Sequence, residues 1–477
     1  MRLAPAIRRI AVAGALALAG LAAATPGPAG AAQGAFVPGH LLATGRMIAS
    51  PAVLGDGRVL LTGGFGYSGI LASNEIFEPG SGAWVHAEPL VSPRFGHTAT
   101  TLFDGRVLVA GGANLTAKYL DSSEIYDPAT GSWTISGAMT TPRAFATATL
   151  MLDGRVLVAG GRNLTAHALA SAEVFDPGTG AWTRVASMQG ARYHYTSALL
   201  EDGRVLVAGG YDAHDVQVAS AEVFDPRTNA WSSAGHMRTA RANHTETRLA
   251  GGRVLVAGGG DRPTGFVDST EIYDPATNAW SAGPRMATAR GFATATPLPS
   301  GRVLLAGGYG NDGDLASAEL FDPRTGRWSS VGPMATPRGQ AAAALLPDGR
   351  VLIAGGQRYT GAFLQSTEVF DPNRTGRLGP TDLQVAPAKV RGQRRITLTY
   401  RAPDAGSTVI RIQRARSGGG WVRLPERIVH ADSAGRNRVL VALTRGARRF
   451  TPGSYRLVVA RPSAGTAAVT VAFTIAA

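Results

Sequence analysis

A nine-residue segment, Asp-Gly-Arg-Val-Leu-Val-Ala-Gly-Gly, recurs along this chain and constrains its fold more than any other feature. It stands at residues 104–112, 153–161 and 202–210, and variants raise the total to seven, at 56–64, 251–259, 300–308 and 348–356. Each copy predicts a turn followed by a strand, because Asp-Gly between apolar runs is a strong hairpin signal. Val-Leu-Val-Ala is typical of a strand buried on both faces, and the closing Gly-Gly permits a backbone turn where side chains would clash.

Three further residue types repeat with this segment at a period of about 49 residues. An arginine precedes each copy, at Arg46, Arg94, Arg143, Arg192, Arg241, Arg290 and Arg338. A glutamate follows each Gly-Gly pair, at Glu75, Glu124, Glu173, Glu222, Glu271, Glu319 and Glu368. Six copies then carry a tryptophan, at Trp84, Trp133, Trp182, Trp231, Trp280 and Trp328. This arrangement resembles the kelch family over roughly residues 36–379, and the resemblance implies a β-propeller in which each repeat forms one four-stranded blade.

The two ends of the repeat region are incomplete in complementary ways. Residues 36–42 stand before Arg46 in the place of the fourth strand of a blade, and the first three strands of that blade are missing. The seventh copy lacks its tryptophan and has Leu378 in that place. We therefore expect the amino-terminal strand to complete the last blade, which removes an exposed sheet edge. The prediction is an all-β fold, with a seven-bladed kelch propeller at residues 33–379 followed by a small β-sandwich.

Residues 1–31 have the pattern of a secretory signal peptide. Arg2, Arg8 and Arg9 form a positive start, residues 10–24 are apolar, and residues 29–31 are small enough for cleavage. The apolar run is too short to span a bilayer, and no later run is long enough. We expect a secreted, extracellular protein, with the Sec and twin-arginine export routes both open. Arginine greatly outnumbers lysine, which indicates a bacterial chain from a GC-rich genome.

Residues 380–477 differ from the repeats in pattern and in charge. About seven short alternating strands predict an immunoglobulin-like β-sandwich, and Pro-Gly-Ser-Tyr at residues 452–455 resembles the tyrosine-bearing strand of fibronectin type III domains. The segment has a net charge of +13, against +14 for the whole chain. Because export argues against nucleic acid, we expect an anionic envelope polymer or an acidic protein surface as the partner. Arginine that merely coats the solvent face is the alternative.

The two ends of the blades are expected to differ. The Asp-Gly turns share one end, while the variable loops after Gly-Gly share the other end with the segments around each arginine. Loops on a rigid scaffold are where binding sites usually lie. Because the seven arginines and seven glutamates occur once per copy, we interpret them as structural ion pairs or backbone clamps. A ring of arginines that grips an acidic ligand is the functional alternative.

Copies four to six carry histidines, tyrosines and carboxylates on the variable end. With His97 of copy two, the ligand-binding candidates are Tyr193, His194, Tyr195, Asn243, His244, His97, Tyr211, Asp212, Asp261 and Arg262. We expect Tyr193, His194, Asn243 and His244 to lie at one depth, near the mouth of the central channel. A sugar or a peptide would use such aromatic faces and polar tips. The alternative is that His97 and His244 only reproduce the Arg-x-x-His-Thr pattern common in kelch repeats.

One segment points to an enzymatic relative. Ala-Arg-Tyr-His at residues 191–194, followed by residues 199–204, resembles the Tyr-His copper-ligand segment in the kelch propeller of galactose oxidase. That family also requires a cysteine cross-linked to a second tyrosine. This chain has no cysteine, so a copper radical oxidase is excluded, along with disulfides and thiol catalysis. Kelch propellers that isomerise sialic acids are a further alternative, although no motif requires one.

We therefore expect a secreted, monomeric, non-catalytic binding or scaffold protein whose variable face takes a carbohydrate, an envelope polymer or a protein partner. No catalytic residue, metal or other cofactor is assigned, and neither nucleic acid nor a membrane span is expected. The alternative is an extracellular carbohydrate-active enzyme, an isomerase or an oxidase of another kind than the copper radical type. An enzyme would need a carboxylate or imidazole with a perturbed pKa in a pocket.

Overall fold

The computed structural model describes residues 33–261 and 265–375, and by their backbone nine strands between Thr381 and Ile475. The predicted signal peptide at residues 1–31 lies outside the described residues. All regular elements of the described part of the chain are strands. The same part contains no helix long and apolar enough to cross a membrane.

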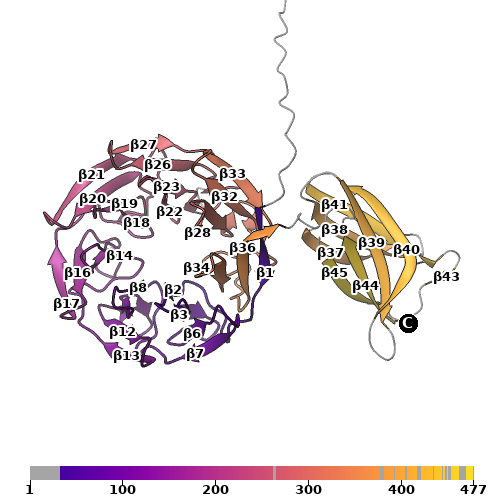
Figure 1. The fold of residues 1–477 in the computed structure, drawn as a ribbon, viewed down its shortest axis with the longest axis horizontal. Coiled ribbons are helices and arrows are strands. Elements are labelled where there is room, and N and C mark those ends of the chain that lie inside the picture. The colour runs from indigo at the N-terminus through magenta and orange to yellow at the C-terminus, as the bar shows by residue number, and fades with distance from the viewer. Residues whose placement is uncertain are drawn as a thin grey trace, which may run out of the picture.

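The strands of the repeat region form seven four-stranded antiparallel sheets around a central channel (Figure 1). The first blade contains β2 (Ser50–Val53), β3 (Val59–Thr62), β6 (Asn74–Phe77) and β7 (Trp84–Ala87); the second β8 (Thr98–Thr101), β9 (Val107–Ala110), β12 (Ser123–Asp127) and β13 (Ser132–Ile135); and the third β14 (Thr147–Leu150), β15 (Val156–Ala159), β16 (Ala172–Asp176) and β17 (Ala181–Val185). The fourth blade contains β18 (Thr196–Leu199), β19 (Val205–Ala208), β20 (Ser220–Asp225) and β21 (Ala230–His236), and the fifth β22 (Thr245–Arg248), β23 (Val254–Ala257), β26 (Thr270–Asp274) and β27 (Ala279–Ala282). The sixth blade contains β28 (Thr294–Pro297), β29 (Val303–Ala306), β32 (Ala318–Asp322) and β33 (Arg327–Val331), and the seventh β34 (Ala342–Leu345), β35 (Val351–Ala354), β36 (Thr367–Thr375) and β1 (Gln33–Pro38). The first strand of every blade contacts the first strand of the next, from β2 round to β34 and back to β2, so these seven strands form the wall of the channel.

Strand β1 completes the seventh blade, which confirms the predicted closure. It pairs antiparallel with β36, so that Phe36 lies opposite Phe370 and Pro38 opposite Glu368. The rings of Phe36 and Phe370 have centroids 5.1 Å apart. The amino-terminal strand therefore covers the edge that β36 would otherwise expose to other chains.

The repeated nine-residue segment forms the turn and buried strand that were predicted. In the second blade the Asp104 carboxylate accepts a hydrogen bond from the backbone N–H of Arg106 at 3.0 Å, and Gly105 has a φ of +87°. The following strand β9 is buried at all four positions. Each fully buried valine or leucine stabilises the fold by roughly 1.5–3 kcal/mol, so the second strands form much of the core between blades.

Five of the six tryptophans connect neighbouring blades through their indole N–H groups. Trp182 packs on Phe175 of its own blade, with ring centroids 5.1 Å apart. Its Nε1–H donates to the backbone oxygen of Gly137 in the preceding blade, at 3.0 Å. This arrangement supports the structural interpretation of these residues, because a polar tip and an apolar ring both find partners within the fold.

The seven arginines and seven glutamates form buried clamps, as predicted. Arg143 is typical: its guanidinium donates to the backbone oxygens of Gly160 and Ser171, both at 2.8 Å, and to Glu173 at 2.9 Å. Glu173 also accepts the backbone N–H groups of Thr140 and Thr141 at the crossover between blades. All seven arginines are at most 1 % exposed, so they are not available to grip an acidic ligand.

Four of the variable loops contain short two-stranded ribbons. They are β4 (Phe65–Gly66) with β5 (Gly69–Ile70), β10 (Ala113–Asn114) with β11 (Lys118–Tyr119), β24 (Gly260–Asp261) with β25 (Gly265–Phe266), and β30 (Tyr309–Gly310) with β31 (Gly313–Asp314). These ribbons extend the Gly-Gly end of the first, second, fifth and sixth blades.

The backbone between Thr381 and Ile475 forms two antiparallel sheets and one ribbon. The first sheet contains β37 (Thr381–Val390), β38 (Gln393–Ala402) and β41 (Gly435–Ala442), and the second contains β40 (Trp421–Asp432), β39 (Gly406–Ala415), β44 (Gly453–Ala460) and β45 (Val469–Ile475). The ribbon pairs β42 (Thr444–Arg445) with β43 (Arg448–Arg449). Side chains of this segment lie outside the description, so its sandwich packing and its basic surface stay predictions.

Candidate binding site at the mouth of the channel

One residue per blade, the second after each arginine, forms a ring around the channel at the end of the variable loops. Its backbone is left-handed in all seven blades, with φ between +51° and +62°, at Ile48, Gly96, Phe145, His194, Asn243, Phe292 and Gln340. Backbone hydrogen bonds connect these residues from blade to blade: Asn243 N–H donates to the oxygen of His194 at 3.1 Å, and Phe292 N–H to that of Asn243 at 2.9 Å. The fold fixes the backbone of this ring, because β-branched and bulky residues rarely adopt such a φ unaided.

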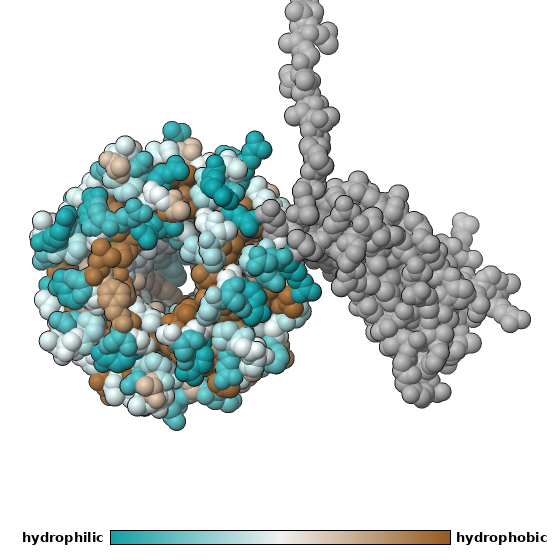
Figure 2. All heavy atoms as spheres, viewed as in Figure 1, coloured by the Kyte–Doolittle hydropathy of each residue, from teal (hydrophilic) through white to brown (hydrophobic). Residues whose placement is uncertain are grey.

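The ring's side chains converge over the channel. The rings of Phe145 and His194 lie 4.4 Å apart, and those of His194 and Phe292 lie 6.4 Å apart although a blade separates them. Gly96 has no side chain, and the Phe145 ring occupies the space that a Cβ there would need. Figure 2 shows the channel open at the centre of the disc, with hydrophobic residues along parts of its rim. We call Phe145, His194, Asn243, Phe292 and Gln340 the mouth cluster.

A second layer of aromatic and charged groups fixes His194. Tyr193 is buried, and its hydroxyl donates to Asp215 at 2.6 Å. Its ring packs against that of Tyr211 at 5.3 Å, and the Arg162 guanidinium lies 4.8 Å from its centroid. Burial, followed by the hydrogen bond to Asp215, raises the pKa of Tyr193. Burial, and then the charge of Arg162, lower the pKa of His194 to about 4, so its imidazole is neutral at pH 7.

Two amides of the mouth cluster have unsatisfied acceptors. Asn243 is 9 % exposed, and its side-chain N–H groups donate to the hydroxyl of Tyr211 and the backbone oxygen of Gly260, each at 3.2 Å. Its Oδ1, and Oε1 of Gln340, are buried atoms with no hydrogen-bond partner among the described residues. Leaving a buried acceptor unpaired costs roughly 1–3 kcal/mol. A ligand with O–H or N–H donors at the mouth would remove that cost.

The remaining predicted site residues lie elsewhere. Tyr195 is buried between the third and fourth blades, where its hydroxyl donates to the backbone oxygen of Ala159. His97 and His244 are 6 % exposed, and the Nε2 atoms of their rings lie 2.8 Å from hydroxyls of the preceding blades, those of Thr62 and Thr196. Burial lowers the pKa of each histidine to about 3. The expectation that His244 shares the depth of His194 is therefore wrong, because its side chain points between the blades.

The candidate residues in the variable loops do not share one location. Asp212 accepts the backbone N–H groups of His214 and Val216 at 2.8 and 3.0 Å, and so closes its own loop. Asp261 belongs to β24, where its backbone pairs with Gly265. Arg262 lies outside the described residues. The structure thus brings Tyr193, His194, Tyr211 and Asn243 together and leaves the other candidates apart from them.

One residue of the channel wall was missed by the sequence analysis. Glu246 lies on β22, and its Oε2 accepts a hydrogen bond from the Thr196 hydroxyl at 2.5 Å. The same hydroxyl lies 2.8 Å from His244 Nε2, so the three groups form a chain. Burial raises the pKa of Glu246 to about 8, against the opposing effect of the Thr196 hydrogen bond. The sequence distinguishes Glu246 by its position in the repeat. Five residues after the arginine this copy has glutamate, whereas the other six have proline, alanine or serine, at Pro51, Ala99, Ala148, Ser197, Ala295 and Ala343.

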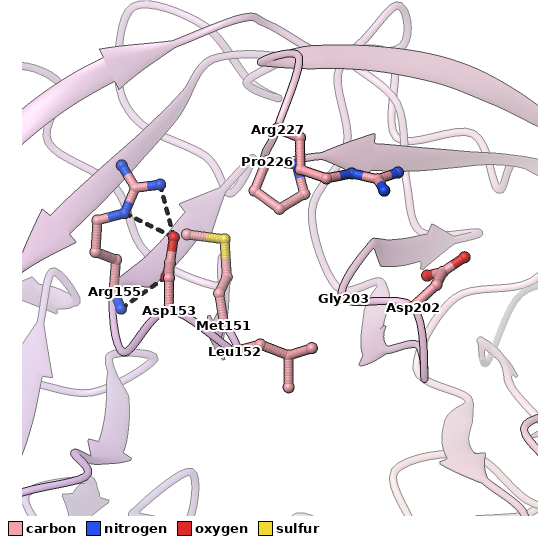
Figure 3. A pocket seen from close by; sticks show the side chains of 8 residues that line it. All are labelled: Met151, Leu152, Asp153, Arg155, Asp202, Gly203, Pro226 and Arg227. Carbon is pink, nitrogen blue, oxygen red and sulfur yellow. Dashed lines mark hydrogen bonds and ion pairs between the residues drawn. The ribbon is translucent and has the colours of Figure 1, made fainter.

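A separate pocket of about 390 Å³ lies at the Asp-Gly end, between the third and fourth blades. Figure 3 shows Arg155 bonded to Asp153 on one side, with Arg227 and Asp202 on the other. A related pocket between the seventh and first blades is lined by the equivalent turn, with Asp56 and Gly57. These pockets follow from a turn that every repeat carries. They lie at the end opposite the mouth cluster.

Comparison with known proteins identifies the repeats. The model of the Kelch motif matches residues 93–140, 143–189, 192–238, 248–287 and 297–335, which are five of the seven copies. With the seven blades described above, the repeat region is a kelch-repeat β-propeller. No curated protein matches the chain at a significant level.

Solved structures share the fold at low sequence identity. A structure described as a novel fungal alcohol oxidase of the AA5 family, in complex with copper, has 18% identity and a TM-score of 0.60, over 93% of this chain and 100% of its own. A structure described as YjhT has 14% identity and a TM-score of 0.45, over 69% of this chain and 95% of its own. The first of these likenesses supports the fold alone.

The copper of that fungal oxidase raises the question whether this chain could hold one. Tyr193 and His194 stand in the segment that resembles a copper-ligand motif, but the Tyr193 hydroxyl is bonded to Asp215 and the His194 ring is packed against Phe145. Among the described residues no three His, Cys, Asp or Glu side chains are grouped so as to hold a metal ion. With no cysteine in the sequence, the donors do not fit the copper radical centre.

Proposed function

We propose that this protein is an exported bacterial binding protein that takes a carbohydrate at the mouth cluster. The observation that carries the proposal is the convergence of two phenylalanine rings and a neutral histidine with two unpaired amide acceptors. The proposal of export rests on the amino-terminal pattern of residues 1–31, and the proposed ligand class rests on the chemistry of the mouth.

A sugar matches both kinds of group at this mouth. Its C–H faces are apolar enough to pack on the partly exposed rings of Phe145 and Phe292. Its hydroxyls are donors for Oδ1 of Asn243 and Oε1 of Gln340, neither of which has a partner among the described residues. Concave sites lined by aromatic groups with a few placed polar atoms are typical of small-ligand binding.

A carbohydrate-active enzyme is the second candidate, because of Glu246. A carboxyl with a pKa raised to about 8 by burial, on the wall of the channel, is the kind of group that acts as a general acid. Glycoside hydrolysis uses a pair of carboxylates. The other charged residue in the seven first strands is Arg248, so we favour binding.

A glycan-binding screen of the full chain tests the proposal. Wild-type protein should bind at least one class of soluble oligosaccharide. His194→Ala should weaken this binding while the protein stays folded. His97→Ala is the matched control: this histidine lies between blades on the Thr62 hydroxyl, away from Glu246, so its loss should lower the melting temperature more than it lowers affinity. If no carbohydrate binds, or if His194→Ala changes nothing, the mouth is not a sugar site.

A further inference from the structure

The wall of the channel below the mouth is almost uncharged. The first strands β2, β8, β14, β18, β22, β28 and β34 are built from serine, threonine, alanine, proline, valine and leucine, and only β22 adds charged residues, Glu246 and Arg248. Arg248 is at the Asp-Gly end, and its Nη1 lies 3.9 Å from Glu201. Glu246 therefore has no cationic partner on the wall at its own level.

Glu246 differs from the buried clamp glutamates of the fold. Each of the seven clamp glutamates has an arginine nitrogen within 3.0 Å of one oxygen and a backbone N–H at 2.7 Å from the other. Glu246 has only the Thr196 hydroxyl, and its Oε1 is buried without a partner among the described residues. A buried carboxylate is costly unless it is paired with a cation and hydrogen-bonded.

The fold does not require a carboxyl at this position. Six of the seven blades have proline, alanine or serine there, and the equivalent side chains are partly exposed in every blade. Glu246 is itself partly exposed, and it belongs to β22, which begins two residues after the ring residue Asn243. A ligand held at the mouth cluster can therefore extend to it along the channel.

We propose that Glu246 binds the protonated amine of the ligand, so that the mouth accepts an amino sugar whose nitrogen is free. This inference rests on the proposed carbohydrate function and deepens it. An ammonium supplies the positive charge that the wall lacks and up to three donors, of which one would satisfy Oε1. The faces of Phe145 and Phe292 also attract a cation on its way in. An N-acetylated sugar has neither the charge nor the extra donors.

Protonation makes the proposed contact dependent on pH. With the pKa of Glu246 near 8 in the free protein, the carboxyl is mostly protonated at pH 7 and must lose its proton to pair with an ammonium. The groups that face it are the Thr196 hydroxyl and, through that hydroxyl, His244, whose pKa burial lowers to about 3. His244 thus stays neutral from pH 6 to 9. Cyclohexylamine stays protonated over this range, as a lysine amine does, so its affinity should rise by up to about tenfold per pH unit below pH 8 and level off above it. The amine of glucosamine is a weaker base that loses its own proton near neutral pH, so its affinity should pass through a maximum instead.

The test compares three oligosaccharides of equal length and linkage, made of glucosamine, N-acetylglucosamine or glucose, together with cyclohexylamine as a sugar-free amine. Calorimetric titration of the full chain at pH 8 should give glucosamine the tightest binding. Glu246→Gln should weaken glucosamine and cyclohexylamine by about tenfold or more, because hydrogen bonds to charged groups are the stronger ones. It should leave the two uncharged sugars within a factor of about two.

Glu201→Gln is the matched control, since it removes an exposed carboxylate at the far end of the channel. Equal affinity of wild type and Glu246→Gln for glucosamine would overturn the amine proposal while leaving the carbohydrate function intact. Binding of cyclohexylamine with no binding of any sugar would uphold the amine contact and overturn the carbohydrate function. Equal losses of glucosamine affinity in Glu201→Gln and Glu246→Gln would mean that only the long-range attraction of negative charge contributes to binding. That result also overturns the proposal.

Discussion

Replacing Glu246 by glutamine should make the protein more stable, and increasingly so as the pH rises. Burial raises the pKa of this carboxyl from its usual 4.5 to about 8. The unfolded chain releases the proton near pH 4.5, whereas the folded protein holds it until about pH 8. The carboxyl therefore contributes stability that is fully present below pH 4.5 and is lost as the pH rises through 8. Glutamine has the same shape but no carboxyl to deprotonate, so it causes no such loss of stability.

The size of the effect follows from the shift. About 3.5 pKa units correspond to about 5 kcal/mol at most, at about 1.4 kcal/mol per unit. The side chain is partly exposed to the channel, and water there screens the charge, so we expect about 2–3 kcal/mol between pH 5 and pH 9. Urea unfolding of wild type and Glu246→Gln, followed by tryptophan fluorescence at pH 5, 7 and 9, measures it.

The pH dependence of the difference is what identifies the cause. Glu201→Gln, an exposed carboxylate on the same channel, should follow the wild type at every pH. If the free energies of unfolding of the wild type and Glu246→Gln differ by the same amount at pH 5 and pH 9, burial does not keep the carboxyl protonated. The inference that Glu246 lacks a cationic partner in the free protein is then wrong.

Three further changes test the fold. Arg143→Met leaves Glu173 as a buried carboxylate without its cation and should cost about 3–5 kcal/mol in the free energy of unfolding; a loss under 1 kcal/mol in chemical denaturation would contradict the clamp. Deletion of residues 33–45 should lower the melting temperature and cause aggregation through the exposed edge of β36, and an unchanged melting curve would show that β1 is dispensable. His97→Asn should reduce the loss of stability as the pH falls from 6.5 towards 3, because the unfolded chain takes up a proton near pH 6.5 and the folded histidine, with a pKa of about 3, does not; parallel acid-unfolding curves would contradict this.

Repetition made most of the fold predictable. Seven copies of one turn-and-strand segment with fixed arginine, glutamate and tryptophan positions predicted seven blades. The missing tryptophan at the end of the seventh copy, together with the unattached strand at residues 36–42, predicted the closure that β1 and β36 form. The arginines were interpreted as structural because they recur in every copy, and their burial confirms it.

The site was less predictable, because neighbouring residues after each arginine point in different directions. The second residue adopts a left-handed conformation, which at His194 sends the side chain over the channel towards Phe145 and Phe292. The third residue then points between the blades, as Tyr195, His97 and His244 do. A left-handed histidine cannot be recognised from residue type alone. Glu246 could have been found from the alignment of the seven copies, since it replaces a small residue.

Affinity for the tightest-binding oligosaccharide, measured for a mouth variant and for a control, tests the central claim most directly. Phe145→Ala combined with Phe292→Ala removes the two rings that converge over the channel, and Phe103→Ala removes a ring that is 70% exposed at the opposite end. Loss of aromatic anchors at a binding site typically costs at least 2 kcal/mol, or about thirtyfold. The account predicts a loss of that size for the mouth variant and an unchanged dissociation constant for Phe103→Ala. Equal affinity of the wild type and the mouth variant would contradict it.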